Sequence, residues 1–149
     1  MPQVRCDIRG VFVAVNQSSA APAVVLKDES GHQIPIFIGL WEAVSISSAI
    51  NKESSPRPFT HDLFLDLMKR YSISVSRLII DSCEEGVYYA NLFLEKEGRD
   101  EILDCRPSDG IAIALRSGAP IFIEEELIVA GSQDVNPSDL LDLAAFLQM

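Results

Sequence analysis

Residues 105–123, CRPSDGIAIALRSGAPIFI, describe a helix followed directly by a strand. Pro107 stands at a favoured first-turn position, and Gly118 is the usual kind of residue to end a helix. Arg106 lies just outside the start of this helix, and Asp109 lies in its first turn. A carboxylate there complements the partial positive charge of the helix N-terminus, whereas a cation opposes it. We therefore expect Arg106 to have a negatively charged partner.

A second Arg-Pro pair occurs in RPFTHDLF, residues 57–64. Thr60 is a good N-cap for a helix running to about Tyr71, so Arg57 again precedes a helix start. Two explanations are open for both arginines. Either each forms a bidentate pair with a nearby carboxylate, or each holds an anionic ligand together with free helix N–H groups. A planar guanidinium suits phosphate in the second way.

Outward from these segments, hydrophobic periodicity predicts the remaining elements. Strands are expected at residues 4–15, 23–27, 32–38, 76–83, 87–95, 100–106 and 119–123, and further helices at 40–51 and 136–149, with Glu124–Glu126 as a solvated turn. This order predicts an α+β fold, in which about three helices and a short C-terminal helix pack on a mixed, mainly antiparallel sheet. We expect a single compact domain over residues 1–135 and a helical tail over 136–149.

Two of these elements carry a predicted buried face. Strand alternation places one set of residues of the first strand on the same side, namely Val4, Cys6, Ile8, Gly10 and Phe12. In the tail helix, Leu140, Ala144 and Leu147 share one side. A helix of about 11 residues is not stable alone in water, so this tail must dock on the domain.

The composition narrows the class of protein. The chain has 149 residues, of which 48% are hydrophobic, and no apolar run approaches a membrane span. The first ten residues lack an apolar signal core, and the three cysteines are far apart without a CxxC pair, so we expect a cytoplasmic protein without a disulfide or zinc site. The net charge is −10, and all of it lies in residues 76–149. Any contact with nucleic acid must therefore be local or bridged by a cation.

Several ionisable residues are candidates for chemistry. Glu42, Asp62 and Asp109 each begin a predicted helix, where a carboxylate can simply complement the helix dipole. His61 can be a general acid or base, or a hydrogen-bonded structural histidine. If the fold brings Asp104 together with Glu42 and Asp109, the three acids could hold Mg²⁺ or Mn²⁺. The chain contains no P-loop, GxGxxG, GxSxG or HExxH motif, which disfavours the enzyme classes that depend on them.

Four segments together resemble the bifunctional nuclease domain family, which occurs in bacteria and has plant relatives. They are IPIFIGLWEAVSI (34–46), RPFTHDLF (57–64), GVYYANLFL (86–94) and DCRPSDGIAIALRSGAPIFIEEELI (104–128). The resemblance covers about residues 4–130, and it implies a compact, often self-associating α+β domain, with an activity on both DNA and RNA that is assigned to plant members. Where many relatives have alanine after the RPSD aspartate, this chain has Gly110, which lowers helix propensity by up to about 1 kcal/mol.

Two functions remain open at this point. The first is hydrolysis of phosphodiester bonds in DNA or RNA, in which Arg57 and Arg106 hold phosphate and His61 is the acid or base. Glu42, Asp62 or Asp109 would then activate water, directly or through a divalent ion. The alternative is a non-catalytic, oligomeric protein that binds a small anion or a protein partner. For either function we expect a homo-oligomer, with a dimer as the favoured form.

Overall fold

The computed structural model describes residues 2–15, 19–132 and 140–148. Its strands are β1 (Gln3–Val15), β2 (Ala20–Asp28), β3 (Gln33–Phe37), β4 (Ser74–Glu84), β5 (Val87–Lys96), β6 (Arg99–Cys105), β7 (Ile121–Glu124) and β8 (Leu140–Asp142). They form one sheet in the order β3-β2-β1-β7-β4-β5-β6, and β8 also pairs with β1, at the end of β1 away from β7. The pair of β4 with β7 is parallel, and the other pairs between described strands are antiparallel.

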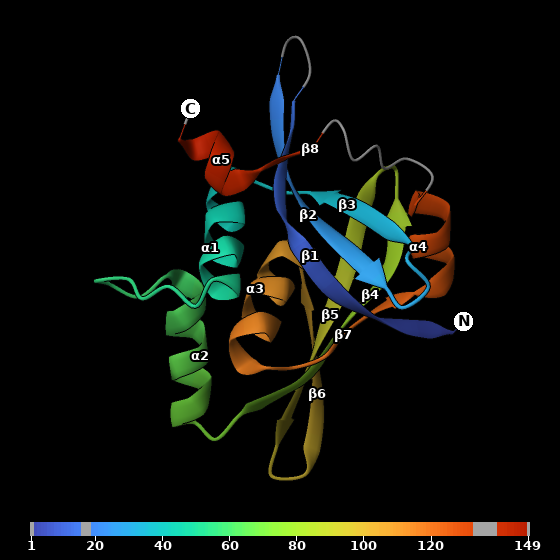
Figure 1. Cartoon of the computed structure of the whole chain (residues 1–149). Helices are drawn as coiled ribbons and strands as arrows, with labels where there is room; N and C mark the ends of the chain where they lie inside the picture. The colour runs from blue at the N-terminus through green and yellow to red at the C-terminus, as the bar shows by residue number, and fades with distance from the viewer. Residues whose placement is uncertain (1, 16–18, 133–139, 149) are drawn as a thin grey trace.

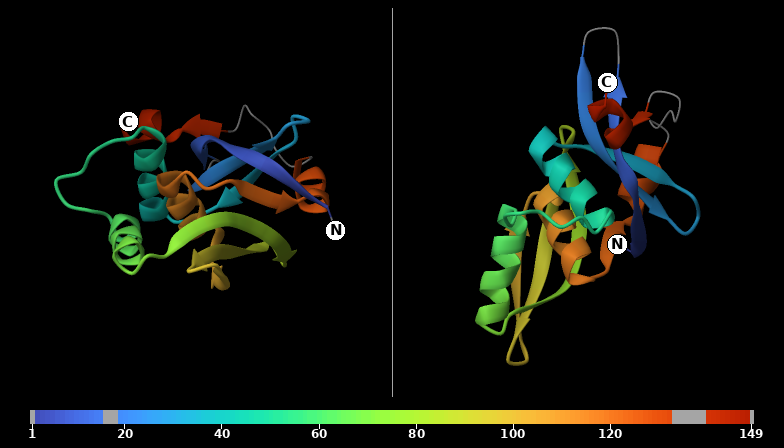
Figure 2. Two further views of the ribbon diagram at one scale, coloured as in Figure 1. Left: turned by 90° about the horizontal axis from the view of Figure 1, so that it is seen from below. Right: turned by 60° about the vertical axis from the view of Figure 1, so that its left-hand side comes forward.

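The helices are α1 (Leu40–Ile50), α2 (Thr60–Arg70), α3 (Pro107–Ser117), α4 (Glu125–Gly131) and α5 (Leu143–Leu147). Helices α1, α2 and α3 lie together at one side of the molecule, and α4 lies at the opposite side (Figure 1). The loop between α1 and α2 arches away from the body of the protein (Figure 2). This arrangement confirms the predicted α+β class and the mixed, mainly antiparallel sheet. No helix in the described ranges is long and apolar enough to cross a membrane.

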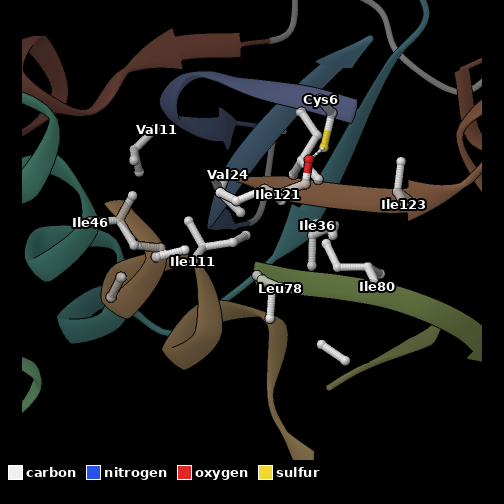
Figure 3. Packing of buried hydrophobic residues seen from close by; sticks show 14 of the residues in the cluster. Cys6, Val11, Val24, Ile36, Ile46, Leu78, Ile80, Ile111, Ile121 and Ile123 are labelled. Carbon is white, nitrogen blue, oxygen red and sulfur yellow. Dashed lines mark hydrogen bonds between the residues drawn. The ribbon is translucent and has the colours of Figure 1, made fainter. Parts of the chain in front are cut away.

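Helix α3 is central because it connects β6 to β7 and packs on β4, β5 and both other helices of its group. Pro107 occupies its first turn, and Gly118 ends it in the left-handed conformation with φ of 74°. The helix is buried along most of its length, and Gly110 lies so close to the Leu78 side chain that an added Cβ would clash with it. The side chains that form the hydrophobic core come from β1, β2 and β3, from β4, β5 and β7, and from the helices (Figure 3). Among them are Val11, Val24, Ile46, Leu78, Ile111 and Ile121.

The predicted buried face of the first strand is wrong beyond its middle. The pairing of β1 with β2 shifts by one residue between Ile8 and Gly10, which marks a β-bulge. Because an inserted residue reverses the alternation, Val11 and Val13 face the core at 4% and 1% exposure, in place of Phe12.

Two further local predictions are corrected. Phe59, and not Thr60, is the N-cap of α2, and Thr60 is its first helical residue. The segment expected as a solvated turn instead begins α4 at Glu125, because acids suit a first turn and Ile128 anchors the helix in the core.

The tail also differs from the prediction within residues 140–148, and its first part, 136–139, lies outside the described residues. Leu140 belongs to β8, and the helix that follows has only five residues. Its buried anchor is Leu143 at 2% exposure, whereas Ala144 is exposed and Leu147 is 55% exposed. Pairing of β8 with β1 fixes this orientation and overrides helical periodicity.

Candidate functional site

The first turns of three helices line one pocket of about 270 Å³, which we call the helix-start pocket. Its residues come from the beginnings of α1, α2 and α3 and are Trp41, Glu42, Ser45, Phe59, Thr60, His61, Arg106 and Asp109. Each helix N-terminus carries a partial positive charge from its unpaired N–H groups. Their convergence favours the binding of an anion, whereas the carboxylates of Glu42 and Asp109 in the same lining oppose it.

His61 lies inside this pocket with 13% of its side chain exposed. Its Nδ1 is 2.7 Å from the Ser45 hydroxyl, and its Nε2 is 2.9 Å from Oδ1 of Asp109. A neutral imidazole satisfies both contacts when Nε2–H donates to the carboxylate and Nδ1 accepts from the hydroxyl. His61 therefore connects a hydroxyl on α1 to a carboxylate on α3.

Asp109 is held from its other side by Arg106. The guanidinium donates from Nε to Oδ2 at 2.9 Å and from Nη2 to Oδ1 at 3.2 Å, which is a bidentate pair. Burial alone raises the pKa of Asp109, but the hydrogen bonds and positive charges of Arg106 and His61 outweigh it, so the pKa is lowered. Asp109 is therefore ionised at neutral pH and can stabilise a protonated His61.

Arg106 has a second acidic partner in Glu42. Its Nη1 is 3.2 Å from Oε1 of Glu42, and the hydrogen bond and charge of Asp109 chiefly raise the pKa of Arg106. The side chain is nonetheless 65% exposed, and it also lines a neighbouring pocket of about 420 Å³ with Phe37 and Val87. Arg106 thus has the carboxylate partner that its position requires, and it keeps a face open to solvent between two pockets.

Asp62 does not enter the helix-start pocket. Its Oδ2 accepts from the Phe59 backbone N–H at 2.9 Å, and its Oδ1 accepts from Nε of Arg116 at 2.8 Å. The Arg116 side chain is only 9% exposed and also donates to the backbone carbonyls of Ser45 and Ala112, each at 3.1 Å. Arg116 therefore joins α1, α2 and α3 from beneath, and Asp62 belongs to this scaffold.

Sequence reasoning missed Ser45 and Arg116. Ser45 follows Glu42 by three residues, so helical spacing places both on one side of α1, and this was the available signal. Arg116 gave no such signal, because a cation in the last turn of a helix is adequately explained by the helix dipole.

The remaining candidates lie apart from the pocket. Arg57 is exposed in the loop before α2, and within the described residues no carboxylate is at ion-pair distance from it. Asp104 is exposed on β6, and no group of three or more His, Cys, Asp or Glu residues suited to a metal occurs in the part of the chain that the structure describes. Glu42 and Asp109 share one guanidinium, so Arg106 compensates one of their two negative charges in this arrangement.

Fold and pocket together define a single α+β domain in which three helix starts surround a histidine, a serine and an arginine–carboxylate cluster. The chain matches the bifunctional nuclease domain over residues 24–136, which include every residue of the helix-start pocket. It belongs to the bifunctional nuclease domain family.

Individual relatives differ in how much of their length is matched. An uncharacterized protein of Mycobacterium tuberculosis is 36% identical over 123 residues, which are 82% of this chain and 73% of the relative. Bifunctional nuclease 1 of Oryza sativa subsp. japonica is 29% identical over 118 residues, 76% of this chain and 36% of the relative. Bifunctional nuclease 1 of Arabidopsis thaliana is 28% identical over 129 residues, which are 83% of this chain and 40% of the relative. The chain thus spans well under half the length of these plant relatives.

Proposed function

We propose that this protein hydrolyses phosphodiester bonds in DNA or RNA at the helix-start pocket. The observation that carries the proposal is the position of His61, which joins the Ser45 hydroxyl to the ionised Asp109 beside an exposed arginine. Names of plant relatives as bifunctional nucleases support the same class of reaction. A general base in contact with a hydroxyl, and an adjacent cation, are what displacement at phosphorus requires.

In this mechanism the scissile phosphate binds at the exposed side of Arg106. Negative charge that develops on its oxygens is stabilised by the guanidinium and by the converging helix N-termini. Nδ1 of His61 accepts the proton of the attacking oxygen and later returns a proton to the leaving oxygen. Asp109 stabilises the imidazolium between these steps, and Glu42 holds Arg106 in place.

The net charge of −10 opposes binding of nucleic acid to most of the surface. Arg57, on the exposed loop before α2, is the cation that we propose as a second, weaker phosphate contact. A divalent ion that bridges the acidic surface and the substrate stays a prediction. Binding is therefore expected to be local, weak and sensitive to salt.

The test compares the two histidines of the chain. His32 also contacts an aspartate, Asp28, at 2.9 Å, but it lies in the β2–β3 turn, away from the helix-start pocket, and so is a matched control. Cleavage of labelled single- and double-stranded DNA and RNA is measured with Mg²⁺, with Mn²⁺ and with chelator. We expect His61→Gln to lower the rate about 10²–10⁴-fold and His32→Gln to leave it within about twofold of the wild type, as for surface substitutions.

Two outcomes would contradict the proposal. One is a wild-type protein that cuts none of the four substrates under any condition. The other is a His61→Gln protein that retains the wild-type rate, because the activity then comes from elsewhere or from a contaminant.

One observation favours the second candidate, a non-catalytic protein that binds an anion or a partner. Arg106 is already paired with two carboxylates, which weakens its attraction for phosphate. This candidate predicts that the protein cleaves none of the substrates and binds a labelled oligonucleotide only weakly, with little further loss in Arg106→Gln. Self-association also stays a prediction. Exposed side chains such as Trp41 (77%) and Leu63 (61%) support it. Light scattering would test it.

A further inference from the structure

We propose that the Ser45 hydroxyl is the nucleophile of this site and that it becomes transiently bonded to the phosphate at the end of the cut strand. The inference rests on the proposed function for its substrate, but the reactivity of Ser45 can be measured without a nucleic acid. Ser45 lies in the second turn of α1, is 3% exposed, and reaches the helix-start pocket with its side chain.

The hydrogen bonds of His61 decide between serine and water as the attacking group. Nε2 is committed to Asp109 and Nδ1 to the Ser45 hydroxyl, so neither ring nitrogen remains to bind a water molecule. Activation of water by His61 would first require one of these two contacts to break. The proton that the imidazole is placed to accept is therefore that of Ser45.

A serine inside a helix has an ordinary alternative partner, the backbone carbonyl one turn before it. Ser117 in α3 adopts this arrangement and donates to the carbonyls of Ile113 at 2.9 Å and Ala114 at 3.3 Å. Ser45 instead directs its hydroxyl across to another helix, to a histidine that an aspartate orients from behind. A chain of hydroxyl, imidazole and carboxylate also activates serine on unrelated folds, although there Nε2 contacts the serine and Nδ1 the carboxylate.

The reaction balances with these groups alone and one water. Ser45 Oγ forms a bond to phosphorus while the bond from phosphorus to the leaving oxygen breaks, and the serine proton passes through His61 Nδ1 to that oxygen. The intermediate is a phosphodiester between Ser45 and the strand end that keeps the phosphate. Water then attacks its phosphorus, and a proton of that water returns through His61 to Ser45 as the P–Oγ bond breaks. Arg106 compensates the charge on the phosphoryl oxygens in both steps.

The experiment uses the full chain and a fluorophosphonate probe, which phosphonylates an activated serine with release of fluoride. Intact-mass and peptide analysis should find one adduct, on Ser45. Labelling should disappear in Ser45→Ala, fall more than tenfold in His61→Gln, and persist in the matched control Ser117→Ala. Circular dichroism and a thermal melt of each variant show that it is folded.

Three results would overturn the inference: no adduct on the folded wild type, an adduct on another residue, or equal labelling of His61→Gln. A Ser45→Ala protein that cuts nucleic acid at the wild-type rate would also overturn it, while leaving the proposed nuclease function intact if His61→Gln is inactive. Conversely, a labelled Ser45 in a wild type that cuts no nucleic acid would refute the proposed function alone.

Discussion

The two Arg-Pro segments differ in where the arginine stands relative to its helix. Arg106 is the N-cap of α3, so its side chain can fold back onto Asp109 three residues later. Arg57 stands two residues before Phe59, the N-cap of α2, in an exposed loop. The corresponding acid of α2, Asp62, is bound instead by Arg116 from the last turn of α3. The same dipeptide thus places one arginine in the pocket wall and leaves the other on the surface.

The largest effect that this comparison predicts is the loss of activity when Arg106 is replaced. Arg106→Gln removes the cation nearest to the scissile phosphate and should lower the cleavage rate by about 10²-fold or more. Arg57→Gln should lower it by less than about fivefold, chiefly through weaker binding, because an exposed loop cation contributes mainly a screened attraction. Single-turnover rates with one labelled oligonucleotide measure both. Equal losses in the two variants would show that the loop closes on the substrate and that the two arginines act as a pair.

The scaffold beneath the pocket gives the next largest effect, on stability. Arg116→Met removes the cation beside Asp62, whose side chain is 40% exposed, and leaves the carbonyls of Ser45 and Ala112 without this donor. It should lower the free energy of unfolding by about 1–3 kcal/mol. Arg70→Met is the matched control, because the Arg70–Asp66 pair is 73% and 55% exposed and should contribute under about 1 kcal/mol. Urea unfolding of both variants tests this. Similar midpoints for the two would mean that the helices are held together by apolar packing alone.

The same residues show how much of this site could be predicted from the sequence. The helix of residues 107–117, its first-turn proline and its terminal glycine were predictable, because they depend on local conformation. The need of Arg106 for a negative partner followed from the helix dipole. The meeting of Ser45, His61 and Asp109 was not predictable, because it depends on how three helices pack and on a buried cation that resembled an ordinary helix-end residue.

The fold shows the same division between local and long-range causes. Element order and class followed from periodicity and turn residues. The inward face of β1 did not, because the bulge near Gly10 reverses the alternation. The tail did not either, because pairing of β8 with β1 decides which of its leucines is buried.

Gly110, which follows Asp109, gives a smaller effect on stability. Alanine there should gain up to about 1 kcal/mol of helix propensity. Its Cβ would meet the fully buried Leu78 side chain and the Cys105 sulfur, and overpacking costs about 1–3 kcal/mol. We expect Gly110→Ala to be less stable by about 1 kcal/mol, the difference between these ranges. Urea unfolding tests this. In a Leu78→Val background, Gly110→Ala should instead raise the free energy of unfolding. A stabilised Gly110→Ala single variant would show that α3 is free to shift away from β4.

The smallest effect concerns the pH dependence of the Arg106 segment. Because the pKa of Asp109 is lowered in the folded protein, its ionised form stabilises the fold above its unfolded value, near 4. This contribution is lost as the pH falls through the lower, folded value. The difference in urea midpoint between wild type and Asp109→Asn should therefore be present at pH 5 and narrow as the pH falls below about 4. A difference that stays constant over this range would mean that packing holds Asp109 in place. Arg106 would then gain little from its carboxylate, and in this respect it would resemble Arg57.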